Sequence, residues 1–317
     1  MTKPYEVLCE LEDFPFPDSF SLAGVSFTRM SRGWMLPGHA AAFNIPADSA
    51  VTFVRVEAAD EKQAGRVAVG LTERSVETLR VGMKFFVRAE VSDIRIRRGS
   101  GVAVRAPGKA VSFATASRQS EIVGPTWPSG AYDAVLRYLG PLEALLLEHD
   151  RPRIRKSIER TVHWISEAIA VSGADVRVLL LCTALESLLT APEDRRKGES
   201  IAIRSMLLPS AIDQGFGDPR EIVRVYDIRS RIVHGSRYGI ANDRHHQVLL
   251  SACKYQLSCM LQLLNDRTIR DFGDVRRIIE NEQALRAAAA WLARGSGEHQ
   301  RMRSVILNHL LEESTRG

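Results

Sequence analysis

Arg229 and His234 are the residues of this chain whose types and spacing could do chemistry on a phosphate. An arginine is always protonated and presents five N–H donors in a planar fork, which suits bidentate binding of a phosphate group. A histidine changes its charge near neutral pH, so it can act as a general acid or a general base. Ser230 adds a hydroxyl directly after the arginine. The pattern Arg-x4-His therefore predicts a phosphate clamp beside a proton-transfer group.

Cleavage of RNA without a metal ion is a reaction that such a pair could catalyse. The 2′-oxygen must lose a proton, the charge on the phosphorane must be neutralised, and the 5′-oxygen must gain a proton. His234 could transfer either proton, and general acid–base catalysis contributes about 10²- to 10⁴-fold. Arg229 could hold two non-bridging oxygens as charge develops. Because one chain offers a single imidazole here, a symmetric dimer would supply both the acid and the base.

We expect this pair on a helix over residues 219–234. Its apolar residues recur at helical spacing, which indicates packing against a core. Pro219 suits the first turn, and Gly235 suits the left-handed position that often follows the last turn. Five residues turn a regular helix through about 500°, so Arg229 and His234 are about 140° apart. They can share a cleft only if the helix end is distorted or if a partner chain completes the site.

The same two residues also have a purely structural interpretation. An arginine and a histidine near a helix C-terminus can bind the last carbonyls and pair with a buried carboxylate, for which Glu186 is the candidate. Glu186 is expected to orient Arg229 rather than to act on a substrate. Since a two-residue motif often occurs by chance, the spacing alone leaves both interpretations open.

Further arginines surround the predicted helix and are candidates for RNA binding, namely Arg224, Arg231 and Arg237. The chain carries 43 Lys+Arg and 38 Asp+Glu, a net charge of +5, and its pI is about 9.2. This excess is compatible with a polyanionic partner but is too small to identify one. For any single arginine of the three, a solvated helix face is the simpler explanation.

Length and composition are those of a soluble protein with two domains. Of the 317 residues, 45% are hydrophobic, which is enough for a core in each domain. The longest apolar candidate, residues 176–189, is interrupted by Arg177 and Glu186 and is too short to span a bilayer. The first residues lack the pattern of a secretion signal. We therefore expect a cytoplasmic protein without membrane contact.

We expect neither a metal site nor a cofactor. His245 and His246 are adjacent, and neighbours on a helix diverge by about 100°, with no cluster of carboxylates or cysteines beside them. The exposed start of a helix explains these histidines better. The four cysteines have no CxxC spacing and are expected to be small buried residues rather than metal ligands or disulfides.

The pattern predicts an α+β chain with two domains. Residues 1–123 contain short segments rich in β-branched and aromatic residues, at 51–56, 66–69, 83–88 and 102–105, without a convincing helix between them. A small β-barrel or sandwich is expected there. Residues 124–130 hold two prolines and two glycines and predict a linker. Residues 131–317 are expected to be helical, with helices near 131–147, 154–171, 175–189, 197–208, 219–234, 243–264, 274–293 and 298–312.

Two short segments carry a resemblance to a known family. Ala184-Leu185-Glu186 lies on the most apolar predicted helix, and Ile228-Arg229-Ser230-Arg231-Ile232-Val233-His234-Gly235 ends the one with the pair. In this order of helices, they resemble the HEPN superfamily, most closely its Apea-like group, over about residues 151–264. The resemblance implies a bundle of four or five helices that often dimerises and brings two Arg-x4–6-His motifs to one cleft.

The resemblance also implies functions and roles. Many HEPN proteins are metal-independent endoribonucleases that act in toxin–antitoxin pairs, phage defence and abortive infection. Arg229 and His234 would then be catalytic, with Ser230 and Glu186 in support. RNA, a second copy of the chain, and an antitoxin or trigger protein at the N-terminal domain would be partners. Two alternatives remain: a non-catalytic HEPN dimerisation or interaction module, and a nucleotide-binding accessory protein.

Overall fold

The computed structural model describes residues 2–12, 19–29, 50–86, 95–96, 102–105, 112–113, 139–145, 152–191, 194, 197–235, 239–266, 269 and 271–314. The chain divides into two compact units, Met1–Leu147 and Glu148–Gly317. This division falls later than the predicted boundary, and the predicted linker 124–130 lies outside the described residues. No helix among the described residues has both the length and the apolar content to cross a membrane.

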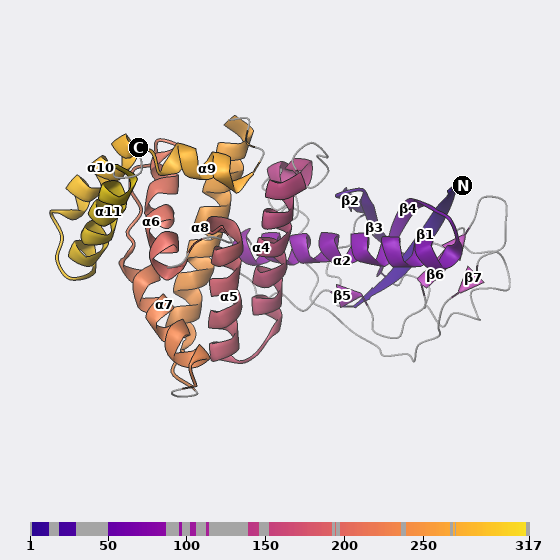
Figure 1. Ribbon diagram of the computed structural model, residues 1–317. Coiled ribbons are helices and arrows are strands. Elements are labelled where there is room, and N and C mark those ends of the chain that lie inside the picture. The colour runs from indigo at the N-terminus through magenta and orange to yellow at the C-terminus, as the bar shows by residue number, and fades with distance from the viewer. Residues whose placement is uncertain are drawn as a thin grey trace. The chain divides into compact units, whose positions relative to one another are not determined.

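The N-terminal unit contains an antiparallel sheet (Figure 1). Its strands are β1 (Lys3–Glu12), β2 (Phe20–Leu22), β3 (Val25–Arg29), β4 (Ala50–Ala58), β5 (Arg95–Ile96), β6 (Val102–Arg105) and β7 (Ser112–Phe113). The strand order is β2-β3-β4-β1-β6-β7, and β5 pairs with β1. The strands predicted at 51–56 and 102–105 are confirmed as parts of β4 and β6. The described strands form one sheet, so the predicted barrel or sandwich is not confirmed.

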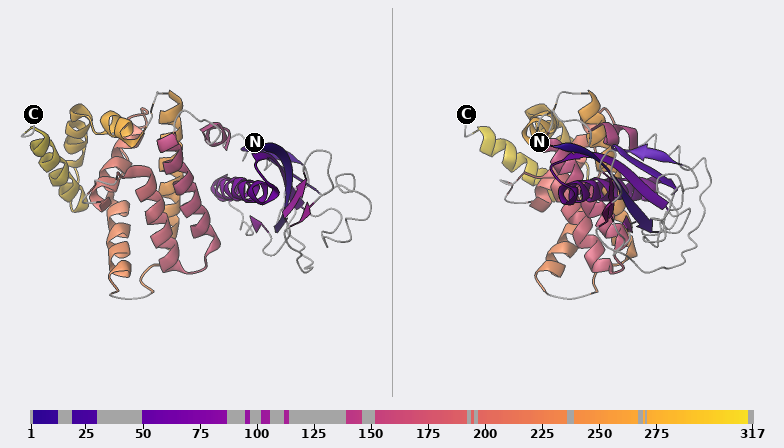
Figure 2. Two further views of the ribbon diagram at one scale, coloured as in Figure 1. Left: turned by 45° about the vertical axis from the view of Figure 1, so that its right-hand side comes forward. Right: turned by 90° about the vertical axis from the view of Figure 1, so that its right-hand side faces the viewer.

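A long helix, α2 (Glu61–Phe86), lies between β4 and β5 in sequence and packs on one face of the sheet (Figure 2). The strands predicted at 66–69 and 83–88 are therefore wrong, since both segments fall within this helix as far as it is described. The valines gave a β signal, but Val67 is 40% exposed while Ala68 and Val76 are buried at helical spacing. Burial of one helix face against the sheet outweighs β propensity here.

The start of α2 carries a capping signal that could have revealed the helix. The backbone N of Gln63 donates to the Asp60 carboxylate at 2.7 Å, and the Gln63 side chain accepts from the backbone N of Ala59 at 2.8 Å. This arrangement resembles a capping box, except that Gln63 bonds the backbone N of Ala59, one residue before the cap Asp60. At the other end, a Cβ on Gly82 would lie 2.8 Å from the Leu139 side chain, so the helix at 139–145 packs closely against α2.

The C-terminal unit is helical (Figures 1 and 2). Its helices are α4 (Pro152–Ala170), α5 (Ala174–Leu189), α6 (Lys197–Ser210), α7 (Arg220–Val233), α8 (Asp243–Asp266), α9 (Phe272–Ile279), α10 (Glu282–Leu292) and α11 (Glu298–Ser314). The predicted helix 274–293 is in fact two helices. Asn281 begins the second, because its side chain accepts from the backbone N of Ala284 at 2.9 Å.

Helix α5 is the central helix of this unit, as its apolar sequence predicts. It contacts α4, α6, α7 and α8. Its buried residues lie on several sides of the helix: Val178, Leu181, Cys182, Ala184, Leu185, Leu188 and Leu189. All four cysteines of the chain are buried and free, which confirms their expected role as small core residues. Burial raises the pKa of the Cys9 and Cys259 thiols to about 11.

Arg204 on α6 forms a buried ionic network that the sequence does not reveal. Its side chain is 2% exposed and bonds the Asp194 carboxylate at 2.5 and 3.0 Å, Glu280 at 2.5 Å and the Leu189 carbonyl at 2.8 Å. Its guanidinium carbon also lies 5.2 Å from the centre of the Phe272 ring. Because a buried cation needs partners for its charge and its donors, this network ties α6 to the segments before it and after α9.

Candidate functional site

The ion pair between Arg229 and Glu186 is the centre of the candidate site. Arg229 Nη2 on α7 lies 2.8 Å from Glu186 Oε1 on α5. The Glu186 side chain is 14% exposed and that of Arg229 is 32% exposed, so part of the guanidinium faces solvent. Lys197 Nζ lies 4.0 Å from the other carboxylate oxygen. Two cations thus share one carboxylate, which leaves a local excess of one positive charge.

Arg229 lies in the wall of a pocket of about 400 Å³. Lys197 and Gly198 from the first turn of α6 line it, as do Tyr226 and Ser230 from α7. The amides of a helix N-terminus favour an anion, and the two cations act in the same direction. The pocket therefore combines groups of the kind that bind a phosphate.

Three carboxylates also line this pocket. Two of them form ion pairs with an arginine, and the third is exposed to solvent. Glu199 lies 3.9 Å from Arg301, and Asp194 pairs with the buried Arg204. Asp227 is exposed at the edge, where solvent screens its charge. The positive charge that stays uncompensated beside the pocket is accordingly the single excess charge of Arg229 and Lys197 over Glu186.

Tyr226 and Gly198 fix the distance between α7 and the start of α6. The Tyr226 hydroxyl is buried and donates to the Cys182 carbonyl at 2.9 Å, and burial raises the pKa of this phenol. A Cβ on Gly198 would lie 3.3 Å from the Tyr226 ring, so a larger residue would fit only if the ring or the start of α6 moved by a few tenths of an ångström. Sequence reasoning missed Lys197, Gly198 and Tyr226. The sequence does offer one signal for this part of the site, because Gly198 directly follows the basic run Arg195-Arg196-Lys197.

His234 lies at the end of a regular helix. Its backbone N donates to the Ser230 carbonyl at 3.0 Å, and Gly235 follows with φ +71°, which confirms the predicted left-handed position. Helix α7 ends at Val233 and His234 is its C-cap, with φ −83° and ψ 11°, so the spacing of a regular helix applies as far as the cap and still predicts a divergence of about 140° from Arg229. His234 is exposed and does not line the pocket. A single chain therefore does not bring the two predicted catalytic side chains into one pocket.

His234 nevertheless lies on the side of α7 that faces the pocket. It follows Ser230 by four residues and Asp227 by seven, and both of these line the pocket. Residues at these spacings share a helix face. His234 is thus about one turn beyond the pocket wall, while Arg229 enters the pocket from the buried side of the helix.

The three arginines predicted to bind RNA differ in their surroundings. Arg224 Nε lies 3.1 Å from Glu298 and Arg224 Nη1 lies 3.0 Å from Glu221, so its charge is compensated. Arg231 is exposed and donates to the Asp227 carbonyl at 3.4 Å. Arg237 lies outside the described residues. Arg231 could therefore bind an anion without first breaking an ion pair among the described residues, whereas Arg224 could not.

Comparisons with protein-family models, curated proteins and solved structures find no match.

His245 and His246 begin α8, as the sequence predicts. The backbone N of Asn242 donates to His245 Nδ1 at 3.2 Å, and the backbone N of His245 donates to Asn242 Oδ1 at 3.1 Å. This reciprocal pair caps the helix at its first turn.

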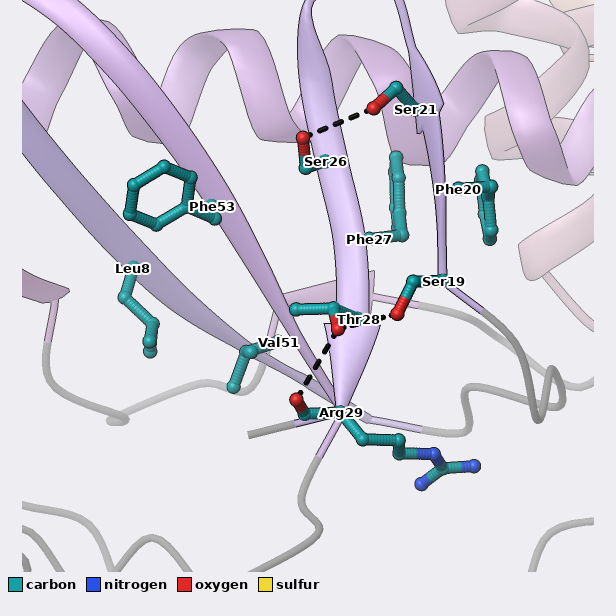
Figure 3. A pocket seen from close by; sticks show the side chains of 10 residues that line it. All are labelled: Leu8, Ser19, Phe20, Ser21, Ser26, Phe27, Thr28, Arg29, Val51 and Phe53. Carbon is teal, nitrogen blue, oxygen red and sulfur yellow. Dashed lines mark hydrogen bonds between the residues drawn. The ribbon is translucent and has the colours of Figure 1, made fainter. Parts of the chain in front are cut away.

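The N-terminal unit has a separate pocket of about 500 Å³ on its sheet (Figure 3). Leu8, Val51 and Phe53 supply apolar surface, and four hydroxyls border it. Those hydroxyls bond one another in pairs: Ser19 with Thr28 at 2.6 Å, and Ser21 with Ser26 at 3.1 Å. This pocket contains none of the predicted site residues.

Proposed function

We propose that this protein is a metal-independent endoribonuclease of the HEPN type, in which Arg229 binds the scissile phosphate and His234 transfers protons. The observation that carries the proposal is the partly exposed Arg229 side chain, which pairs with Glu186 at the wall of a pocket beside Lys197. One arginine is enough to neutralise the Glu186 carboxylate in a purely structural ion pair. The second cation, Lys197, therefore supports a role in binding an anion.

The proposed role of Arg229 follows from its preorganisation. Glu186 restricts the guanidinium before substrate binds, so little conformational entropy is lost when a phosphate arrives. The exposed part of the fork can then bind two non-bridging oxygens as negative charge develops on phosphorus. Lys197 adds a second positive charge, and the Ser230 hydroxyl can donate to the same phosphate.

The proposed role of His234 needs two copies of the residue. One imidazole removes the proton of the 2′-hydroxyl, and the 2′-oxygen forms a bond to phosphorus. The bond from phosphorus to the 5′-oxygen then breaks, and a second, protonated imidazole donates to that oxygen. The products are a 2′,3′-cyclic phosphate and a free 5′-hydroxyl. Since each chain carries one such histidine, we propose that a homodimer forms the active site.

Exposed apolar residues at one end of the helical bundle support this dimer. Val233 at the end of α7 is 53% exposed, and Val176 in the first turn of α5 is 47% exposed. The Asp175 carboxylate accepts from the backbone N of Gly239 at 2.6 Å and of Ala241 at 2.9 Å, which ties the segment after α7 to the start of α5. His234 thus lies at the same end as two uncovered valines.

A homodimer through this end should be disrupted by a charge at either valine. Val233→Asp and Val176→Asp are expected to yield monomers in light scattering, to keep the helical circular dichroism, and to lose RNA cleavage. Leu307→Asp, which alters an apolar side chain 38% exposed on α11, is the matched control and should remain dimeric. A strictly monomeric wild type that cleaves RNA at full rate would exclude the composite site.

RNA cleavage is expected to persist in an excess of chelator, because the proposed chemistry uses a guanidinium and imidazoles as the charged and proton-transferring groups. The rate of the purified protein should be the same in excess EDTA as in added magnesium. Loss of cleavage in EDTA, restored by magnesium or manganese, would show that a metal ion carries the chemistry.

A toxin or phage-defence effector is the biological role that we propose for this activity, with the N-terminal unit as the docking surface for an antitoxin or trigger. The direct test is growth and RNA integrity in a bacterial host that expresses either the wild type or His234→Ala. If the wild type neither slows growth nor degrades RNA, the protein is better described as a non-catalytic dimerisation module or a nucleotide-binding accessory.

A further inference from the structure

Asp227 is the carboxylate of the candidate site that has no counter-ion among the described residues. Its side chain is exposed and lines the pocket that contains Arg229. The other two carboxylates of the described wall form ion pairs with arginines. The nearby Arg231 guanidinium bonds the backbone carbonyl of Asp227 at 3.4 Å and not its carboxylate. Asp227 therefore presents two accessible acceptor oxygens, with their negative charge, at the edge of the pocket.

A carboxylate without a counter-ion is unexpected in a wall that otherwise favours an anion. Like charges repel, so a pocket that bound only a phosphate would be weakened by Asp227. The volume of about 400 Å³ is also in the range of pockets for small organic ligands, and a phosphate alone would leave much of it empty. Another part of the wall is apolar, from Val223, Tyr226 and Met302. These features indicate a ligand with an uncharged, hydrogen-bonding part beside its phosphate.

The position of Asp227 on α7 suits the base of the nucleotide that carries the phosphate. Asp227 precedes Ser230 by three residues, so the two side chains share a helix face about 4.5 Å apart along the axis. Arg229 and Ser230 are the residues proposed to bind the scissile phosphate. A base joined to the neighbouring ribose would then lie one helical turn away, beside Asp227.

The chemistry of a carboxylate selects one base. Its two oxygens only accept hydrogen bonds and lie side by side, so they fit two adjacent N–H donors. Guanine presents such a pair on its Watson–Crick edge, where N1–H lies beside the N2 amino group. Adenine and cytosine have an amino group beside an acceptor nitrogen, and uracil has one N–H between two carbonyls. Those acceptors would face the carboxylate and repel it.

We propose that Asp227 binds the Watson–Crick edge of a guanine in the nucleotide that adjoins the scissile phosphate. The inference rests on the proposed nuclease and names its substrate class, single-stranded RNA with an unpaired guanosine at the cleavage site. The guanosine must be unpaired because a duplex occupies its Watson–Crick edge. A bound base also displaces the water that screens Asp227, which strengthens the hydrogen bonds to the carboxylate.

The test is calorimetric titration of the full chain with the 3′- and 5′-monophosphates of guanosine and of inosine. Inosine lacks only the 2-amino group, so each matched pair of ligands differs by one hydrogen-bond donor. The wild type is expected to bind one guanosine monophosphate at least about tenfold more tightly than the matching inosine monophosphate, because hydrogen bonds to charged groups are the strong ones. Equal binding of the inosine form, or no saturable binding of either guanosine form, would overturn the proposal.

Two variants assign the preference to its residue. Asp227→Asn should bring the ratio of guanosine to inosine affinity close to one, because an amide replaces one acceptor oxygen by a donor that faces a donor of guanine. The variant should keep the helical circular dichroism, since the exposed side chain has no ion pair among the described residues. Asp243→Asn is the matched control, because Asp243 is also exposed and does not line the pocket, and it should keep the wild-type ratio. An unchanged ratio in Asp227→Asn would contradict the assignment.

Mapping of the cleavage sites in a single-stranded RNA separates this inference from the nuclease on which it rests. Cleavage beside unpaired guanosines, with the preference lost in Asp227→Asn, is the expected result. If the wild type binds guanosine monophosphate selectively but leaves RNA intact, the guanine site stands and the nuclease fails. If it cleaves beside all four bases alike and binds inosine monophosphate equally well, the nuclease stands and the guanine site fails.

Discussion

His234→Ala is expected to abolish RNA cleavage while leaving the fold unchanged. The side chain is exposed beyond the last turn of α7 and lines no part of the pocket, so its removal should cost little stability. Its loss removes both the general base and the general acid of the proposed dimeric site. The single-turnover rate should fall by about 10²- to 10⁴-fold or more.

Arg229→Ala is expected to lose cleavage to a similar degree, but its interpretation needs a second variant. Removing the guanidinium also leaves the largely buried Glu186 carboxylate with Lys197 alone, 4.0 Å away. Arg229→Lys keeps the charge and loses the planar fork, so it should remain folded and still cleave slowly. Thermal unfolding of each variant separates a loss of catalysis from a loss of structure.

Arg286→Ala is the matched control for these substitutions. Arg286 on α10 pairs with Glu282 on an exposed helix face, as Arg229 pairs with Glu186, but at 72% exposure and away from the pocket. It should leave both cleavage and stability within experimental error of the wild type. If His234→Ala and Arg229→Lys cleave RNA as fast as this control, the site is structural and the nuclease proposal fails.

Arg204→Ala is expected to destabilise the helical unit by about 3–5 kcal/mol, because it leaves two carboxylates without their buried counter-charge. Asp194 is 8% exposed and Glu280 is 10% exposed in the ion pairs that they form with Arg204. Urea unfolding followed by circular dichroism measures the loss. The same Arg286→Ala control should change the free energy of unfolding by less than about 0.5 kcal/mol.

The network also predicts how acid acts on stability. Burial raises the pKa of Asp194, but the hydrogen bonds from Arg204 outweigh it and hold the pKa below its ordinary value of 3.8. A lowered pKa stabilises the fold above the ordinary value, and this contribution is lost as the pH falls below about 3.8. Arg204→Ala should weaken this acid dependence.

Arg204→Met distinguishes charge from packing in the same network. Methionine keeps most of the buried volume but leaves Asp194 without its ion pair and Glu280 with Arg276 alone, so it should destabilise nearly as much as alanine. If Arg204→Met is as stable as the wild type, the carboxylates are solvated or neutral in the variant, and the network is not required for the fold.

The sequence by itself determined most of the helical unit. The helices at 154–171, 175–189, 219–234 and 243–264 were predictable because local signals mark them: apolar spacing, Pro219 near a first turn and Gly235 after a last turn. These signals act within a few residues, so no knowledge of the rest of the chain is needed. The occurrence of Arg229 and His234 on one helix, about 140° apart, followed in the same way.

Tertiary structure alone decided the surroundings of these residues. In the N-terminal unit, helix α2 has a local signal at its start, the cap made by Asp60 and Gln63, but its β-branched residues favour a strand, and burial of one face against the sheet outweighs that preference. The ion pair of Arg229 with Glu186, the second cation at Lys197 and the network of Arg204 with Glu280 join residues from 11 to 76 positions apart. Such contacts depend on which helices pack together, because a charge is stable in a core only where folding brings its partner to it.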